Sequence, residues 1–142
     1  MAQVIVHTTP EGNLVVTYPV NPNKTIDEIA SSVVPEGIEW FAVEEDDLPA
    51  QKKLRNAWEY DGGVVVNISK AKTLTHSLRR KVRSIELAPH DDVIAKQIPG
   101  TDATQAEASR QVVREKYAKM QNDIDACTTA EQLQSIVDSL IG

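Results

Sequence analysis

Residues 54–71 read LRNAWEYDGGVVVNISKA, and this stretch decides how the two halves of the chain are joined. Alternation over LRNAWEY predicts a strand with Leu54, Asn56, Trp58 and Tyr60 on one side. An Asp-Gly pair and then the β-branched run VVV complete the pattern of a β-hairpin. A strand that presents Trp and Tyr beside a β-branched partner can seat a helix. We therefore interpret residues 51–69 as a hairpin that joins the parts on either side of it.

Residues 1–50 are predicted to form a small ββαβ unit. The runs QVIVHT and NLVVTY flank the turn signal TPEGN, which predicts a first hairpin over residues 3–18. Thr25 and Glu28 have the spacing of a capping box, so a short helix should begin there and stop before Pro35. The run GIEWFAV is expected to form the third strand, and the acidic loop EEDDLPAQ ends the unit.

Residues 70–142 are predicted to form a helical hairpin plus a short helix. Ser69 is expected to cap a long helix with an apolar stripe of Leu74, Leu78, Val82 and Ile85. Pro89 should kink or end this helix, leaving a short continuation up to Pro99–Gly100. The next two helices are expected to begin at Thr101 and at a second capping box, Thr128 with Glu131. The fold class is therefore α+β, with parts at 1–50, 51–69 and 70–142.

Composition indicates an ordinary globular chain with an aliphatic core. The chain has 142 residues, of which 41% are hydrophobic and 4% aromatic. No run approaches the ~18 apolar residues of a membrane span, and the first residues lack the pattern of a signal peptide. Cys127 is the single cysteine, which excludes an internal disulfide and a cysteine-built zinc site. These features predict a protein of a reducing cytoplasm with no membrane partner.

Charge is distributed in blocks. Residues 1–50 hold nine acidic residues and one basic residue, whereas residues 51–83 hold nine basic and two acidic residues. Residues 84–142 are again acidic, and the net charge is −6. Such blocks can pair within one molecule, stay solvated, or steer a charged partner.

No catalytic chemistry emerges from the residue pattern. His7, His76 and His90 have no metal-ligand spacing between them, and Asp91 and Asp92 are better explained by a helix start than by a cation site. Gly62–Gly63 is too short a glycine run to hold a phosphate. Cys127 is expected to be buried filler. The sequence thus predicts a non-enzymatic protein without cofactor or metal.

A basic ridge is the candidate contact surface. Lys72, His76, Arg79 and Arg83 lie at i, i+4, i+7 and i+11 and should share one flank of the long helix. The ridge could bind an acidic protein surface, this protein's own acidic loop EEDDLPAQ, or nucleic-acid phosphates. Trp58 and Trp40 would add aromatic anchors if either is exposed, because Trp and Arg most often dominate interfaces.

The most specific pieces of sequence occur together between about residues 26 and 85. They are Val34–Pro35, Leu48–Pro49, the run Arg55-Asn56-Ala57-Trp58-Glu59, and Lys70–Ala71. This series resembles small proteins encoded among the tail genes of tailed bacteriophages. Leu54 stands where that family often has Phe, and AQKK replaces its usual ADRT, which puts a shared binding surface in doubt.

The helical hairpin also resembles, in architecture only, the tail-fibre assembly chaperones, which are small non-enzymatic proteins. Together the resemblances imply a bacteriophage tail protein that binds another tail or tail-fibre protein, as a minor virion component or as an assembly chaperone. They imply that the protein acts in the host cytoplasm during assembly. Retention of the protein on the virion tail is a further option. A second copy of the chain is the other partner considered. The alternative function is a nucleic-acid-associated regulator that uses the basic helix over residues 70–83.

Overall fold

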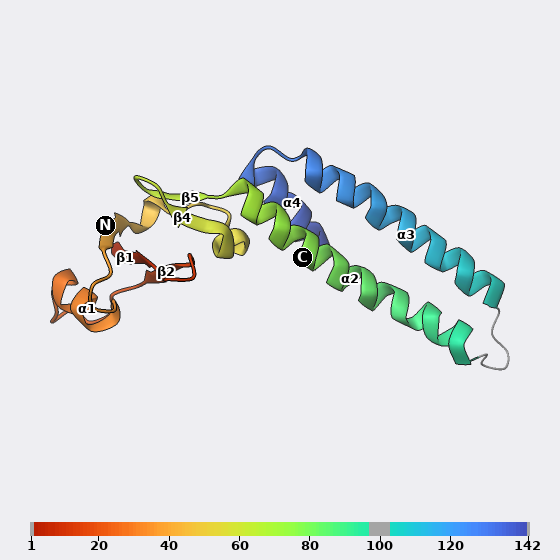
Figure 1. Ribbon diagram of the computed structural model, residues 1–142, viewed down its shortest axis with the longest axis horizontal. Coiled ribbons are helices and arrows are strands. Elements are labelled where there is room, and N and C mark those ends of the chain that lie inside the picture. The colour runs from red at the N-terminus through yellow and green to blue at the C-terminus, as the bar shows by residue number, and fades with distance from the viewer. Residues whose placement is uncertain (1, 97–102, 142) are drawn as a thin grey trace. The chain divides into compact units, whose positions relative to one another are not determined.

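The computed structural model describes residues 2–96 and 103–141 and has the α+β architecture that the sequence predicts (Figure 1). The chain divides into two compact units, Met1–Ala71 and Lys72–Gly142. The first unit therefore contains both the N-terminal strands and the central hairpin. None of the helices in the described ranges is long and apolar enough to cross a membrane.

The first unit is built on a three-stranded antiparallel sheet in the order β2-β1-β3. β1 (Gln3–Thr8) is the central strand, and it pairs with β2 (Leu14–Thr17) and β3 (Trp40–Glu44). α1 (Ile26–Val33) lies between β2 and β3 in sequence. Its predicted cap at Thr25 is confirmed, because the Thr25 hydroxyl accepts from the Glu28 backbone N–H at 3.2 Å; the same hydroxyl donates to the Glu28 carboxylate.

Alternation along β1 gives this sheet two buried faces. Val4 and Val6 belong to one apolar cluster together with Leu48, Trp58 and Val64. Ile5, between them, belongs to a second cluster with residues of α1. Since successive side chains of a strand point to opposite faces, the sheet is covered by α1 on one face and by the central hairpin on the other.

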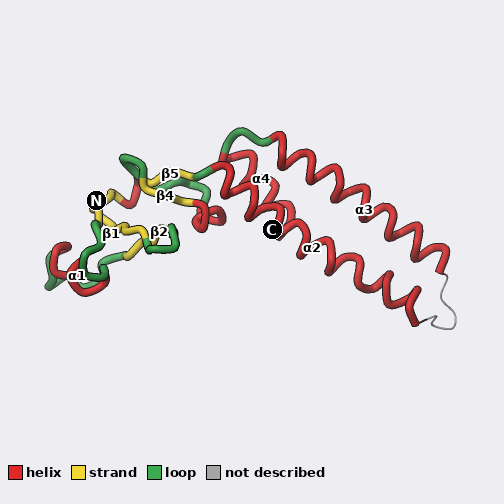
Figure 2. The backbone as a smooth tube through the Cα atoms, viewed as in Figure 1, coloured by secondary structure: helices red, strands yellow, loops and turns green. Residues whose placement is uncertain are grey.

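The segment before the central hairpin differs from the predicted strand. Lys52–Ala57 forms a 3₁₀-helix, η2, and the strand β4 covers only Trp58–Tyr60 before it pairs with β5 (Val64–Val66) (Figure 2). Side chains three apart share a face of a 3₁₀-helix, and Leu54 and Ala57 are both buried. Asn56, which the predicted alternation placed beside Trp58, is exposed. The Asp-Gly turn is confirmed at Gly62, whose φ of 71° suits glycine.

The second unit consists mainly of three helices. α2 covers Ile68–Lys96, α3 covers Ala103–Ala126 and α4 covers Ala130–Ile141. The helix α2 continues through Pro89, so of the two outcomes predicted there, a kink or an end, the end is wrong. The predicted helix end at Pro99–Gly100 and the predicted start at Thr101 lie outside the described residues.

Two predicted helix caps are each displaced. Asn67, not Ser69, caps α2, because its side-chain oxygen accepts from the Lys70 backbone N–H at 3.0 Å. The second capping box is formed by Thr129 and Gln132, one residue later than predicted. Ser, Thr, Asn and Asp all cap well, so adjacent candidates differ only in where the first turn starts.

The buried face of α2 also differs from the predicted apolar stripe. Its most buried positions are Ala71, Thr75 and Arg79. Leu74, Leu78 and Val82 are only half-buried, and Ile85 is 64% exposed. Small and polar residues therefore occupy the most buried positions of α2, while Ile85 of the predicted apolar stripe is exposed.

Candidate partner-binding surface

The predicted basic ridge is used within the chain. The Lys72 Nζ donates to the backbone oxygen of Asp125 at 2.9 Å, and His76 Nε2 lies 2.8 Å from the Asp125 carboxylate. Arg79 Nε donates to His76 Nδ1 at 3.4 Å, so a chain of contacts runs from Arg79 through His76 to Asp125. Three residues of the predicted contact surface, Lys72, His76 and Arg79, therefore contact residues of this chain, whereas the ridge was expected to contact a partner.

Arg79 departs furthest from that expectation, because only 6% of it is exposed. Burial lowers the pKa of its guanidinium, and the nearby positive charges of Arg80 and Arg83 lower it further. Arg83 is half-buried, so no pair of ridge arginines is presented openly to a partner. A basic ridge that meets the C-terminal end of α3 fits the charge attraction expected at a helix C-terminus.

A second polar cluster also joins α2 to α3. The Tyr117 hydroxyl donates to the Glu86 carboxylate, and Lys116 Nζ lies 3.2 Å from the same group. The hydrogen bond from Tyr117 lowers the pKa of Glu86, as does Lys116 to a smaller degree. Burial and the same contact raise the pKa of Tyr117. With the Asp91–Arg110 pair at 2.9 Å, these contacts show that charges of opposite sign meet within the helical unit.

The two tryptophans are not exposed anchors. Trp58 is only 3% exposed and lies in the apolar cluster beneath the central hairpin. Trp40 is half-buried and packs with Ile5, Ala30 and Val34 on the α1 side of the sheet. The condition under which Trp58 would serve as an exposed anchor is therefore not met.

A small pocket lies in the first unit between β2 and η2. Its volume is about 160 Å³. The walls combine an apolar part with polar and basic side chains: Leu14, Val16, Tyr18, Lys52, Arg55, Asn56 and Trp58. Small-molecule sites are usually larger, at roughly 300–1,000 Å³. The size is suited to a single side chain of a partner.

Two cations border this pocket. Lys52 and Arg55 are exposed, and among residues 2–96 and 103–141 no carboxylate lies within ion-pair distance of either. The Lys52 Nζ lies 5.1 Å from the centroid of the Trp58 ring, a cation–π contact that holds the ammonium at the pocket. Arg55 belongs to the last turn of η2. The pocket can therefore bind an apolar side chain of a partner, while Lys52 or Arg55 pairs with a carboxylate next to that side chain.

The sequence contains an indication of this pocket, although the strand predicted over residues 54–60 does not lead to it. Arg55, Asn56 and Trp58 belong to the run of residues 55–59, one of the four pieces that carry the resemblance to phage tail-region proteins. Trp58 has a structural reason to be there, since it fills the core. Arg55 and Asn56 are exposed and fill no core, so folding alone does not account for them. The predicted strand places Arg55 and Asn56 on opposite faces, so its alternation does not indicate that both line one pocket.

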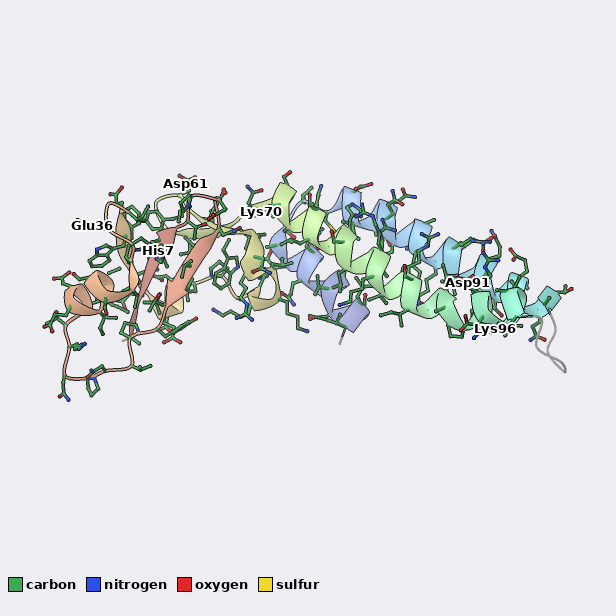
Figure 3. All side chains as sticks on the ribbon, turned by 60° about the horizontal axis from the view of Figure 1, so that its bottom comes forward. His7, Glu36, Asp61, Lys70, Asp91 and Lys96 are labelled. Atoms are coloured by element: carbon green, nitrogen blue, oxygen red, sulfur yellow. The ribbon has the colours of Figure 1, made fainter. Side chains whose placement is uncertain are left out.

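Metal-ligating and nucleophilic side chains also occur elsewhere in the described residues. No group of three or more metal-ligating side chains is found in the part of the chain that the structure describes. Cys127 is buried as predicted, and its thiol donates to the Asp123 carbonyl at 3.2 Å. Burial raises the pKa of this thiol, which keeps it protonated and unreactive at neutral pH. His7 is buried in β1 (Figure 3).

Comparison with known proteins adds no further assignment, since no family model, curated protein or solved structure matches this chain.

Proposed function

We propose that this protein is a non-enzymatic bacteriophage tail protein that binds another tail or tail-fibre protein, as a minor virion component or as an assembly chaperone. The observation that carries the proposal is the pocket between β2 and η2. Three residues of the motif that resembles phage tail-region proteins, Arg55, Asn56 and Trp58, line that one pocket.

The pocket supports a protein partner better than a small molecule. Its volume of about 160 Å³ accommodates one side chain. An arginine, an asparagine and a lysine surround it, and arginine is among the residues that most often carry binding energy at interfaces. The partner segment should therefore present an apolar or aromatic side chain next to an aspartate or glutamate.

The alternative, a nucleic-acid-associated regulator using residues 70–83, has less support. Lys72 and His76 contact Asp125, and Arg79 is buried. Arg80 and Lys81 stay exposed, but they are adjacent and project from α2 in different directions. Binding of several phosphates along a strand would need a longer open row of cations.

The test is capture of partners from phage-producing cells by the tagged full-length protein. We expect the wild type to retain a tail or tail-fibre protein through a high-salt wash, read by mass spectrometry. Arg55→Glu should lose that protein, because it places a negative charge where the partner's carboxylate would lie. Lys24→Glu makes the same change of charge at another exposed site of the first unit and should retain it.

Two results would count against the proposal. Equal capture by wild type, Arg55→Glu and Lys24→Glu would remove the pocket as the contact surface. Recovery of nucleic acid alone, lost at high salt, would favour the regulator instead. A search for the protein in purified virions then separates a virion component from a chaperone.

A further inference from the structure

One face of α2 remains exposed along its C-terminal half. The helix has 29 residues and so is ~43 Å long, whereas α4 has 12 residues and is ~18 Å long. In the second unit α4 lies beside the first part of α2 and does not reach its far end, which is marked by Asp91 and Lys96 (Figures 1 and 3). Within the described part of the second unit, residues 72–96 and 103–141, the far part of α2 therefore contacts α3 without a third helix over it.

The exposed face carries an apolar residue that the unit does not bury. Ile85 is 64% exposed, although it belongs to the predicted apolar stripe. Lys81, Ala88 and Asp92 share its face, because the four positions are spaced by four, three and four residues. All four are exposed. The contacts with α3 in this region come instead from Glu86 and Asp91.

The charges at the two ends of this face are open. Lys81 and Asp92 have opposite signs, and neither forms an ion pair within residues 2–96 and 103–141. They lie too far apart on the helix to reach each other, since eleven residues rise ~16 Å. Each therefore remains available to a charge on another molecule.

The order of these residues is self-complementary. Lys81 and Asp92 are equally distant from the point between Glu86 and Leu87, and so are Ile85 and Ala88. When two such helices meet antiparallel about a two-fold axis at that point, Lys81 of each faces Asp92 of the other. Ile85 then packs beside the small Ala88 of the second copy. A two-fold interface has this property, because one patch must complement itself.

From this pattern we infer that the face of α2 formed by Lys81, Ile85, Ala88 and Asp92 is the contact between two copies of this chain. The partner at this face is a second copy of the chain, because Lys81 and Asp92 both meet opposite charges when the same face of another α2 lies antiparallel to it. Two ion pairs border the apolar centre, and both are created by one symmetry operation. The inference does not depend on the tail-protein proposal, which uses a pocket in the other unit.

The test measures the mass of the full-length protein across a concentration series, by sedimentation equilibrium. We expect a monomer–dimer equilibrium. Lys81→Glu and Asp92→Lys should each weaken the dimer by about tenfold, because each single change turns two attractions into repulsions. The combined variant Lys81→Glu with Asp92→Lys should restore it, since the charges again face opposite partners. Arg80→Glu, an equal change of charge on another face, should leave the equilibrium unchanged.

Ile85→Asp provides a second measurement that does not rely on charge exchange. The side chain is exposed, so helical content by circular dichroism should be kept while the dimer is lost. A wild type that stays monomeric throughout the series would overturn the inference, as would a dimer that tolerates each single exchange. If the protein is monomeric and Ile85→Asp abolishes capture of a tail protein, the face belongs to another occupant and the second copy is excluded.

Discussion

Trp58 shows how a single residue ties the first unit together. It is 3% exposed and shares a cluster with Val4 and Val6 of β1 and Val64 of β5. It also lines the pocket that Lys52 and Arg55 border. The residue thus contributes both to the core and to the shape of the candidate binding surface.

Trp58→Ala should lower the free energy of unfolding by about 3–5 kcal/mol, the cost of emptying a large aromatic site. Urea denaturation followed by circular dichroism measures it. Trp58→Phe, which keeps a ring in the cluster, is the matched control and should cost clearly less. Equal losses in the two variants would mean that the indole is not packed as the cluster requires.

The hydrogen bond between Tyr117 and Glu86 gives the helical unit a pH dependence. Tyr117 lowers the pKa of Glu86 in the folded protein below its unfolded value. The stabilisation is therefore complete above the unfolded pKa of about 4.3 and is lost as the pH falls through the folded pKa.

Tyr117→Phe keeps the buried ring and should cost about 1.5 kcal/mol at pH 7, because it removes one hydrogen bond to a charged and partly exposed group. The difference from wild type should shrink near pH 3, where Glu86 is protonated in the unfolded chain. Urea unfolding at both pH values measures it. A difference that grows on acidification would contradict the assigned role of the carboxylate.

At the scale of elements, the start of α2 depends on one side chain. The Asn67 amide oxygen accepts from the Lys70 backbone N–H, and the Asn67 amide group donates to Glu59 at 3.1 Å. The cap therefore also connects the helix to the preceding strand β4. Ser69 lies inside the first turn rather than at the cap.

Asn67→Ala should destabilise the protein by about 1 kcal/mol, the usual cost of losing a cap. Ser69→Ala should cost less, since Ser69 lies inside the first turn of α2 and not at its N-cap. Thermal unfolding of the two variants compares them directly. A larger loss in Ser69→Ala would return the cap to the position predicted from sequence.

At the scale of the whole molecule, each unit has buried apolar residues of its own. Both apolar clusters of the sheet unit lie within residues 4–66. In the helical unit the buried apolar residues include Ile124 and Leu133, which are 0% exposed. Cooperative opening follows contiguous packing, so a cavity in one core should be felt mainly in its own unit.

Leu133→Ala should therefore speed amide exchange in α3 and α4 and leave that of β1 and β3 nearly unchanged. The overall cost should be about 2–5 kcal/mol, as for other buried leucines. Hydrogen exchange read by mass spectrometry resolves the segments. Uniform acceleration across both units would show that they unfold as one body.

The sequence determined the order of elements and the fold class. The turn at TPEGN, the helix cap at Thr25 and the Asp-Gly pair each act over a few residues, and local patterns suffice for them. All three are found as predicted. Ordinary composition and the absence of catalytic motifs likewise needed no tertiary information.

Only the tertiary structure decided which side chains are exposed and can contact a partner. Arg79 looks like a surface cation in sequence, but the packing of α2 buries it beside His76. The sequence pattern predicts that Arg55 lies on the face of a strand opposite Trp58. In the structure it belongs to a 3₁₀-helix and lines the pocket. Exposure depends on contacts between residues far apart in the chain, as between His76 and Asp125. Periodicity within one segment cannot supply that information.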